Sequence, residues 1–216
     1  MTPSRPALLN ALPDFGFAAV FLVTWVAPTA FGDHVVRSLF AVMLMEFIVV
    51  HSSVLMGTTA LKAASRASRA GVIAAFGLFY SLFAGGFSLA FHSWWPLASF
   101  WGQTINRLLG VLLGQAPDGD QRALLQRGWT VAVVLYLVLC MATVLLPVPA
   151  LGITPAVAAA QQIPGRGLWV DRPEKVIAFG FLYFLLTAWS EMGGHAWVKP
   201  PRGAATAPTS EGAATR

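Results

Sequence analysis

Apolar blocks, each close to the length of a membrane span, recur along the chain and limit its fold more than any other feature. They lie at residues 15–31, 35–61, 71–91, 128–146 and 176–197. A helix needs about 20 apolar residues to cross a hydrocarbon core of roughly 30 Å. Only 11% of the residues are charged, whereas a soluble domain has about 25%. The sequence therefore predicts an all-α fold, a polytopic integral membrane helical bundle of five or six transmembrane helices.

The number of spans depends on residues 96–114, PLASFWGQTINRLLGVLLG. This segment is long enough to cross a bilayer, but Gln103, Asn106 and Arg107 lie near its centre. It forms either a short polar span or re-entrant element, or an amphipathic helix in the outer interface. Six spans place more of the lysines and arginines in the cytoplasm than five spans do, and short basic loops favour that side. The charge bias therefore favours six spans with both ends of the chain cytoplasmic.

The loop KAASRASRA after the second block predicts the orientation. Lys62, Arg66 and Arg69 occur there without an acidic residue. Because positive residues in short loops favour the cytoplasm, we predict that this loop and the N-terminus are cytoplasmic. The first block is interpreted as a span that follows a short arm at residues 1–12, and a cleaved signal peptide is the alternative.

The polar segments between the blocks indicate a single domain. Residues 115–127 are predicted to form a loop, and residues 148–173 a structured loop with a short helix near 155–162. We predict one transmembrane helical domain over residues 1–198 and a disordered polar tail over residues 199–216. The basic residues lie in short loops and form no patch, so we expect the lipid bilayer as the partner and no nucleic acid. Other membrane subunits or a homo-oligomer are further possible partners.

Four ionisable side chains at membrane depth are the candidate site residues: Glu46, His51, Glu191 and His195. Such a residue costs at least roughly 2.5–3.5 kcal/mol on insertion scales and normally has a partner. At about 100° per residue, Glu46 and His51 differ by about 140° and face different neighbours. Glu191 and His195 follow each other after one helical turn and share a face. If the second and last spans are neighbours and run in the same direction, the two pairs can meet in one pocket.

Several kinds of site fit these four residues. Carboxylate and imidazole ligands suit iron, manganese or zinc, but the spacings Glu-x4-His and Glu-x3-His match neither di-iron bundles nor zinc proteases. Haem ligation by His51 and His195 is another possibility. Intramembrane acids and histidines also form proton or substrate pathways. In the structural interpretation, the four side chains only hold neighbouring helices together.

Arg107 extends this polar core or proton relay to a fifth residue. A guanidinium at bilayer depth needs a partner, and Glu46 is the candidate. An ion pair between Arg107 and Glu46 explains how both residues tolerate the membrane. No Gly-rich phosphate loop, Gly-x-Ser-x-Gly turn or Cys-x-x-Cys pair occurs, so the sequence assigns no catalytic residue and no cofactor.

The second and third blocks carry a resemblance to a known family. The stretch LMEFIVVHSSVLMG contains an acid and is followed by a basic loop and by FGLFYSLFAGGFSLAF, which is rich in Phe and Gly. Over residues 35–95 the chain resembles a family of uncharacterised bacterial multi-pass inner-membrane proteins of unknown function. A histidine is expected in the middle of the third helix, where this chain has Tyr80 and Phe83. The resemblance implies a helical bundle in the bacterial inner membrane and implies no activity.

These observations lead to two functional expectations. The first is a non-enzymatic accessory or transporter-like membrane protein with a buried Glu/His polar core. The alternative is a metal- or haem-binding membrane protein, of oxidoreductase type, that uses the Glu/His pairs.

Overall fold

A computed structural model describes residues 5–113, 119–195 and 197–198 of the chain. Within these ranges the regular structure is helical and contains no strand, which confirms the predicted all-α bundle. The predicted tail at residues 199–216 lies outside the described residues. The helices are α1 (Arg5–Val26), α2 (Val35–Lys62), α3 (Arg66–Ala90), α4 (Trp95–Leu112), α5 (Gly119–Leu145), α6 (Pro155–Ala160), α7 (Leu168–Asp171) and α8 (Pro173–Met192).

Five helices in the described part of the chain are long and apolar enough to cross a membrane. The candidate spans are Leu8–Val26, Val35–Ala60, Arg66–Ala90, Gln121–Leu145 and Pro173–Met192. This finding confirms a multi-pass membrane protein. Helix α4 is long but more polar, and it is not among these candidates.

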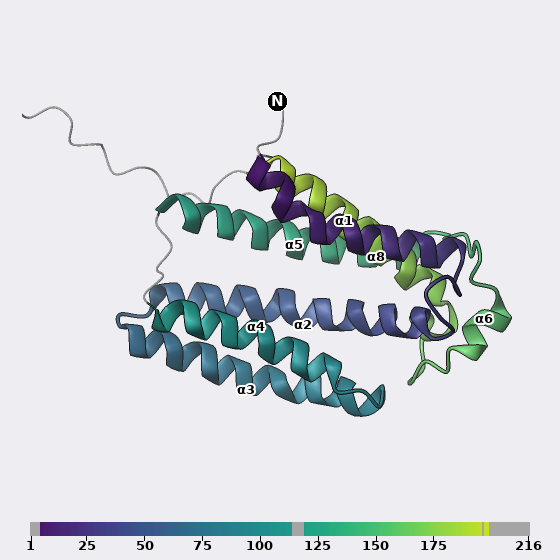
Figure 1. Cartoon of the computed structure of the whole chain (residues 1–216), viewed down its shortest axis with the longest axis horizontal. Coiled ribbons are helices and arrows are strands. Elements are labelled where there is room, and N and C mark those ends of the chain that lie inside the picture. Colours follow the sequence, from purple (N-terminus) through teal and green to yellow (C-terminus); the bar gives the residue numbers. More distant parts are fainter. Residues whose placement is uncertain (1–4, 114–118, 196, 199–216) are drawn as a thin grey trace, which may run out of the picture.

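The six long helices lie side by side and alternate in direction (Figure 1). Helix α4 runs along α2 and α3 and does not lie across the end of the bundle (Figure 1). As a result, α5 begins at the end of the bundle where α2 ends and α3 begins. The described chain therefore runs back and forth through six long helices, of which five, without α4, are apolar enough to be candidate spans.

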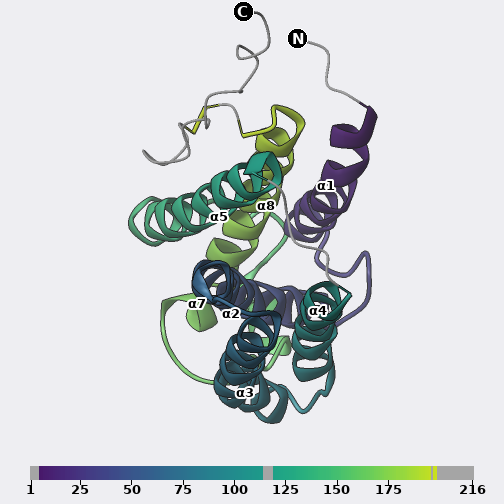
Figure 2. The same ribbon diagram turned by 90° about the vertical axis from the view of Figure 1, so that its left-hand side faces the viewer.

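Helix α2 is the central element because it joins two groups of helices. Viewed along the bundle, α1, α5 and α8 lie on one side of α2, and α3 and α4 lie on the other (Figure 2). Its buried side chains contribute to both hydrophobic cores. Phe40 and Met43 belong to the core shared with α1, α5 and α8, whereas Ile48 and Met56 belong to the core shared with α3 and α4.

The pairing of α1 with α8 is the most extensive helix contact in the described chain. Phe17 stacks on Phe184 with ring centroids 4.9 Å apart, and Phe21 packs beside the same ring at 5.6 Å. Gly180 makes room for this contact, because a Cβ atom there would lie 2.3 Å from Cε1 of Phe21. The absence of a side chain at one position thus sets the register of two membrane helices.

Two predicted boundaries at the N-terminal side of spans are wrong. Residues 5–12 are not an arm, since α1 begins at Arg5 and passes through Pro13. The apolar residues before Pro13 extend the first span to Leu8. Residues 119–127 are not a loop either, because α5 begins at Gly119. The polar composition of that segment marks an exposed helical turn and not an irregular loop.

The predicted end of the last span is also wrong. Helix α8 ends at Met192, and Gly194 adopts a left-handed φ of +59°. The backbone N–H of His195 then donates to the carbonyl of Ser190 at 2.9 Å. Glycine favours this conformation, and the reversed hydrogen bond satisfies a carbonyl of the last helical turn. His195 therefore lies in a turn and does not continue the helix.

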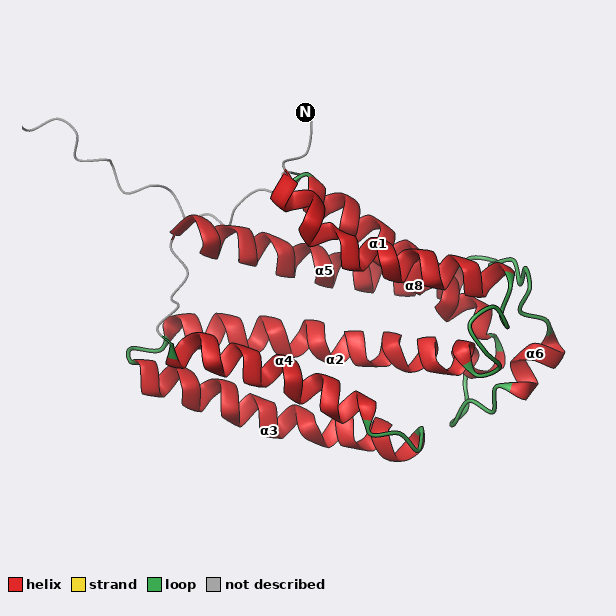
Figure 3. Ribbon diagram, in the orientation of Figure 1, coloured by secondary structure: helices red, strands yellow, loops and turns green. Residues whose placement is uncertain are grey.

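The loop between α5 and α8 covers one end of the bundle (Figure 3). The predicted short helix is confirmed as α6. Gln161 just after α6 is buried, and it donates to the carbonyl of Asp33 at 2.8 Å. The Lys175 ammonium group is also buried and donates to three carbonyls at the end of α5, the shortest distance being 2.8 Å to Thr143. Gln161 thus fixes the loop to the connection between α1 and α2, and Lys175 fixes the start of α8 to the end of α5.

Candidate functional site

Glu46 lies near the middle of α2 and faces α8. Its Oε1 atom accepts a hydrogen bond from the Tyr183 hydroxyl, with an O–O distance of 2.7 Å. Tyr183 is 1% exposed and Glu46 is half-buried, so this hydrogen bond is partly shielded from water. The geometry brings the second and last spans together, as predicted, but through Tyr183 and not through Glu191 or His195.

Aromatic rings enclose the Glu46–Tyr183 pair. Tyr136 of α5 lies edge-on to the Tyr183 ring with centroids 5.6 Å apart, and its hydroxyl donates to the carbonyl of Met43 at 2.9 Å. Phe179 also lies edge-on to Tyr136, at 4.8 Å. These rings supply a tightly packed apolar wall, and a charge inside such a wall is poorly solvated unless it is paired.

Asp14 is a further acidic residue of the site, which the sequence interpretation missed. It lies on α1 within the span Leu8–Val26. It is close enough to both Glu46 and Glu191 to interact electrostatically with each carboxyl group. Three helices, α1, α2 and α8, therefore contribute one carboxyl group each to the same region of the membrane interior.

Glu191 occupies the last turn of α8. Its Oε2 atom is inaccessible to solvent and has no hydrogen-bond partner among the described residues. One turn before it, the buried Thr187 hydroxyl likewise has no partner in the described part of the chain. Tyr183, Thr187 and Glu191 follow at intervals of four residues, so they lie on one face of α8. This face provides a row of proton-bearing groups from the middle of the bundle to the end of the helix.

No basic side chain within the described part of the chain forms an ion pair with any of the three carboxyl groups. Among the described residues, the one ion pair joins Arg172 to Glu174 at 2.8 Å, outside this region. The acidic cluster, defined here as Asp14, Glu46 and Glu191, can therefore hold protons and has no basic partner among the described residues. A buried carboxyl group without such a partner has to be neutral or accept donated hydrogen bonds.

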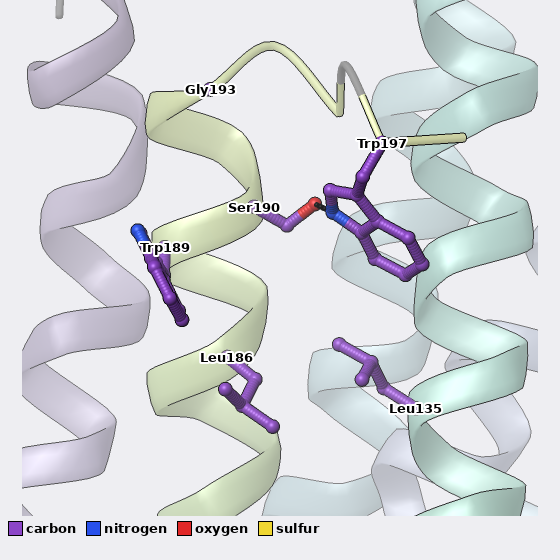
Figure 4. A pocket seen from close by; sticks show the side chains of 6 residues that line it. All are labelled: Leu135, Leu186, Trp189, Ser190, Gly193 and Trp197. Atoms are coloured by element: carbon purple, nitrogen blue, oxygen red, sulfur yellow. Dashed lines mark hydrogen bonds between the residues drawn. The ribbon is translucent and has the colours of Figure 1, made fainter. Parts of the chain in front are cut away.

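His195 belongs to a separate cluster at the end of α8. Its Nδ1 atom lies 2.8 Å from the Ser190 hydroxyl, and the Trp197 indole N–H donates to the same hydroxyl at 2.7 Å. Figure 4 shows Ser190 and Trp197 beside a cavity of about 510 Å³ between α5 and α8. Leu135 and Leu186 make the walls of this cavity largely apolar.

The chemistry of the Ser190–His195 pair favours a structural role. A serine nucleophile needs a histidine that accepts its proton and becomes an imidazolium. Here burial lowers the pKa of His195 below its ordinary value, and the positive charge of Arg127 lowers it further. Both effects disfavour the imidazolium. The two hydrogen bonds on Ser190 instead fasten the turn after α8 against the helix end.

His51 does not join either cluster. Its Nδ1 atom lies 2.9 Å from the Phe47 carbonyl one turn earlier in α2, and the two rings are 4.0 Å apart. No group of three or more His, Cys, Asp or Glu side chains among the described residues is placed to hold a metal ion. The predicted metal set of Glu46, His51, Glu191 and His195 is not brought together, and the two histidines are engaged in separate local contacts.

Arg107 also has partners other than the predicted one. Its Nη2 atom donates to the Ser53 hydroxyl, and its Nη1 atom lies 3.6 Å from the sulfur of Met56. The predicted ion pair with Glu46 is wrong, because no ion pair within the described residues involves either side chain. The sequence placed both residues at membrane depth, but Ser53 lies two helical turns after Glu46, and Arg107 contacts α2 there.

Two signals in the sequence point to the residues that were missed. Asp14 follows LLNAL, an apolar segment that lengthens the first span enough to include it. Tyr183 lies eight residues before Glu191 on the same helical face. Comparison of the chain with protein-family models, curated proteins and solved structures finds no match, so the functional interpretation depends on the geometry of the acidic cluster.

Proposed function

We propose that this chain is a non-enzymatic, proton-linked membrane module of the transporter-like or accessory type, located in a bacterial inner membrane with its N-terminus in the cytoplasm. The observation that carries the proposal is the hydrogen bond from Tyr183 to Glu46 beside two further carboxyl groups that have no ion-pair partner among the described residues. The bacterial location rests on the family resemblance of residues 35–95. The orientation rests on Lys62, Arg66 and Arg69, which the structure places at the end of α2 and in the first turn of α3, on either side of a short connection.

Glu46 is the group that we assign to hold the proton. In the neutral form it carries the proton itself, and in the ionised form it accepts the hydrogen bond from Tyr183. Charge in hydrocarbon is costly, so the two forms favour different packing of α2 against α8. A group whose charge changes the packing of two helices can link proton binding to a change in conformation.

The row of Tyr183, Thr187 and Glu191 on one face of α8 provides the path for that proton. Protons move between groups within hydrogen-bond reach or through one intervening water. Thr187 and Glu191 lead from Tyr183 toward the end of the bundle that carries the basic loop, and Asp14 lies beside this row. The Thr187 hydroxyl and the Glu191 Oε2 atom have no hydrogen-bond partner among the described residues, so the proposed path from Glu46 past Asp14, Thr187 and Glu191 to the cytoplasmic surface requires bridging water molecules.

Proton flux into liposomes tests this assignment. Purified protein is reconstituted with an internal pH indicator, and proton entry is measured under an imposed membrane potential. We expect entry above that of protein-free liposomes, and we expect Glu46→Gln to lower the protein-dependent rate by roughly 10²-fold, the lower end of what a positioned proton donor contributes.

Tyr136→Phe is the matched control, because it removes a hydroxyl from the same aromatic wall but leaves the Glu46–Tyr183 bond in place. It should keep most of the flux. Circular dichroism and gel filtration establish that each variant is folded. Wild-type liposomes no more permeable to protons than empty ones would contradict the proposal, as would full flux in the Glu46→Gln protein.

A further inference from the structure

A second site lies where α2, α3, α4 and α5 meet, away from the acidic cluster. It is a cavity of about 420 Å³, lined in part by Ser53, Met56, Arg107, Val111 and Trp129. Binding pockets for small molecules occupy roughly 300–1,000 Å³ and are mostly apolar with a few polar groups. This cavity fits that description, and its one charged group is a guanidinium.

No acidic side chain among the described residues forms an ion pair with the Arg107 guanidinium. Its two contacts in the described chain are to the neutral groups of Ser53 and Met56. Guanidinium has five N–H donors in a planar fork, and these contacts engage only two of its nitrogens. The fork matches the geometry of a carboxylate or a phosphate. An anion is therefore the ligand that satisfies this group.

The apolar walls of the cavity leave room for an apolar part of the ligand in addition to its anionic group. Trp129 lies against Gly57, where a Cβ atom would be 2.1 Å from the indole ring, so the absence of a side chain on α2 makes room for the indole. Leu125, which lines the same cavity, is 45% exposed. The cavity therefore opens on the lateral surface of the helical bundle. A ligand that enters there comes from the lipid phase and has an apolar body.

We propose that this cavity binds an anionic amphiphile, with a carboxylate or phosphate head group at Arg107 and the apolar chain against Val111, Leu125 and Trp129. Arg107 lies five residues before the end of α4, or about 7–8 Å along the axis at 1.5 Å per residue. At that depth a head group remains near the polar interface while its chain stays in hydrocarbon. The proposal is independent of the function assigned to Glu46.

Quenching of tryptophan fluorescence by brominated fatty acid tests the site directly. The protein is placed in nanodiscs of zwitterionic lipid and titrated with dibromostearate, with dibromostearyl alcohol as the uncharged analogue. The signal of Trp129 is the difference between wild type and Trp129→Phe. We expect dibromostearate to quench this signal and the alcohol to bind about 10-fold or more weakly, the range for a charge-assisted hydrogen bond.

Two variants separate the head-group contact from the cavity. Arg107→Gln should weaken dibromostearate binding about 10-fold or more and leave the weak binding of the alcohol unchanged. Val111→Phe keeps the charge but fills the cavity, so it should weaken both ligands. Arg66→Gln changes the net charge equally at an exposed position of the basic loop, and it should bind as wild type does.

Each arm has an outcome that overturns the proposal. Equal quenching by the acid and the alcohol, or undiminished binding to Arg107→Gln, rejects Arg107 as the head-group contact. If inorganic phosphate displaces dibromostearate at equal concentration, the ligand is a water-borne anion and not a membrane amphiphile. If Arg107→Gln does not fold, undiminished binding to the Val111→Phe protein rejects the cavity.

Discussion

At the scale of single residues, the Tyr183 hydroxyl is the group whose removal is most informative. Tyr183→Phe keeps the ring but leaves the half-buried Glu46 without its donor. An unsatisfied buried polar group costs about 1–3 kcal/mol, so we expect the free energy of unfolding to fall by about this amount. Unfolding in detergent micelles with increasing denaturant measures it.

Tyr136→Phe provides the comparison for that measurement. It removes a hydroxyl whose acceptor is the Met43 carbonyl, which also belongs to the backbone hydrogen-bond network of α2. The expected loss is about 0.5–1.5 kcal/mol, smaller than for Tyr183→Phe. A larger loss for Tyr136→Phe would contradict the view that Glu46 depends on Tyr183.

His195 makes stability depend on pH in a direction that the structure determines. Burial and the charge of Arg127 lower its pKa in the folded protein, so the unfolded chain binds the proton first as the pH falls. The stabilisation is complete above the ordinary pKa of about 6.5 and decreases below it, by about 1.4 kcal/mol per pH unit until the folded pKa is reached. Neutral His195 thus holds the turn after α8.

His195→Asn tests this dependence, because the amide can still hydrogen-bond Ser190 but does not titrate. Melting temperatures in detergent are compared at pH 7.5 and pH 5.5. The wild-type protein should lose more stability on acidification than His195→Asn does, whereas Glu191 and the other carboxyl groups titrate in both proteins and cancel in the difference. Equal losses would show that His195 does not carry the effect.

At the scale of helices, glycine positions predict which contacts are tight. Gly180→Ala should destabilise the bundle by about 1–3 kcal/mol, the cost of overpacking, because its Cβ would meet the Phe21 ring. Gly16→Ala is the matched control on α1, since nothing lies within 4 Å of the added atom. It should be neutral or slightly stabilising, as alanine favours a helix. Thermal unfolding of both variants distinguishes the two cases, and equal effects would contradict the packing of α1 against α8.

The existence of the helices could be predicted from the sequence, but the pairing of their side chains could not. The position and length of each apolar block were enough to locate the central part of each span. The starts of α1 and α5 were misplaced because the spans were drawn only over the apolar blocks at residues 15–31 and 128–146, whereas both helices begin in the more polar residues before them. The depth of Glu46 was predictable, whereas its partner Tyr183 depends on which helix lies beside α2. That choice is made by packing between distant segments, such as Gly180 against Phe21.

At the scale of the whole molecule, the two proposed sites lie in different groups of helices, on opposite sides of α2. The acidic cluster lies between α1, α2 and α8, and the Arg107 cavity lies between α2 and the helices α3, α4 and α5. Both sites therefore share α2 but present opposite charge. If the proposals hold, a ligand at Arg107 and a proton at Glu46 each act on the packing of the same helix.

The path of α4 predicts how the whole chain crosses the membrane. If α4 is a sixth span, then residue 93 lies on the outer side, and residues 65 and 113 lie on the cytoplasmic side. Single cysteines at Ser65, Ser93 and Leu113 in a Cys140→Ser background report this with a membrane-impermeant maleimide. In intact cells only Ser93→Cys should react, and in inverted vesicles Ser65→Cys and Leu113→Cys should react.

The position of Leu113 decides between the two topologies. Leu113 is 72% exposed and directly follows α4, so its accessibility reports the side on which that helix ends. Labelling of Leu113→Cys together with Ser93→Cys in intact cells would show that α4 stays in the outer interface. Helix α5 would then run from outside to inside, which places the basic side chains around Arg127 on the outer side and reverses α8. Because the lysines and arginines would then be distributed less favourably, we expect Leu113→Cys to react only from the cytoplasmic side.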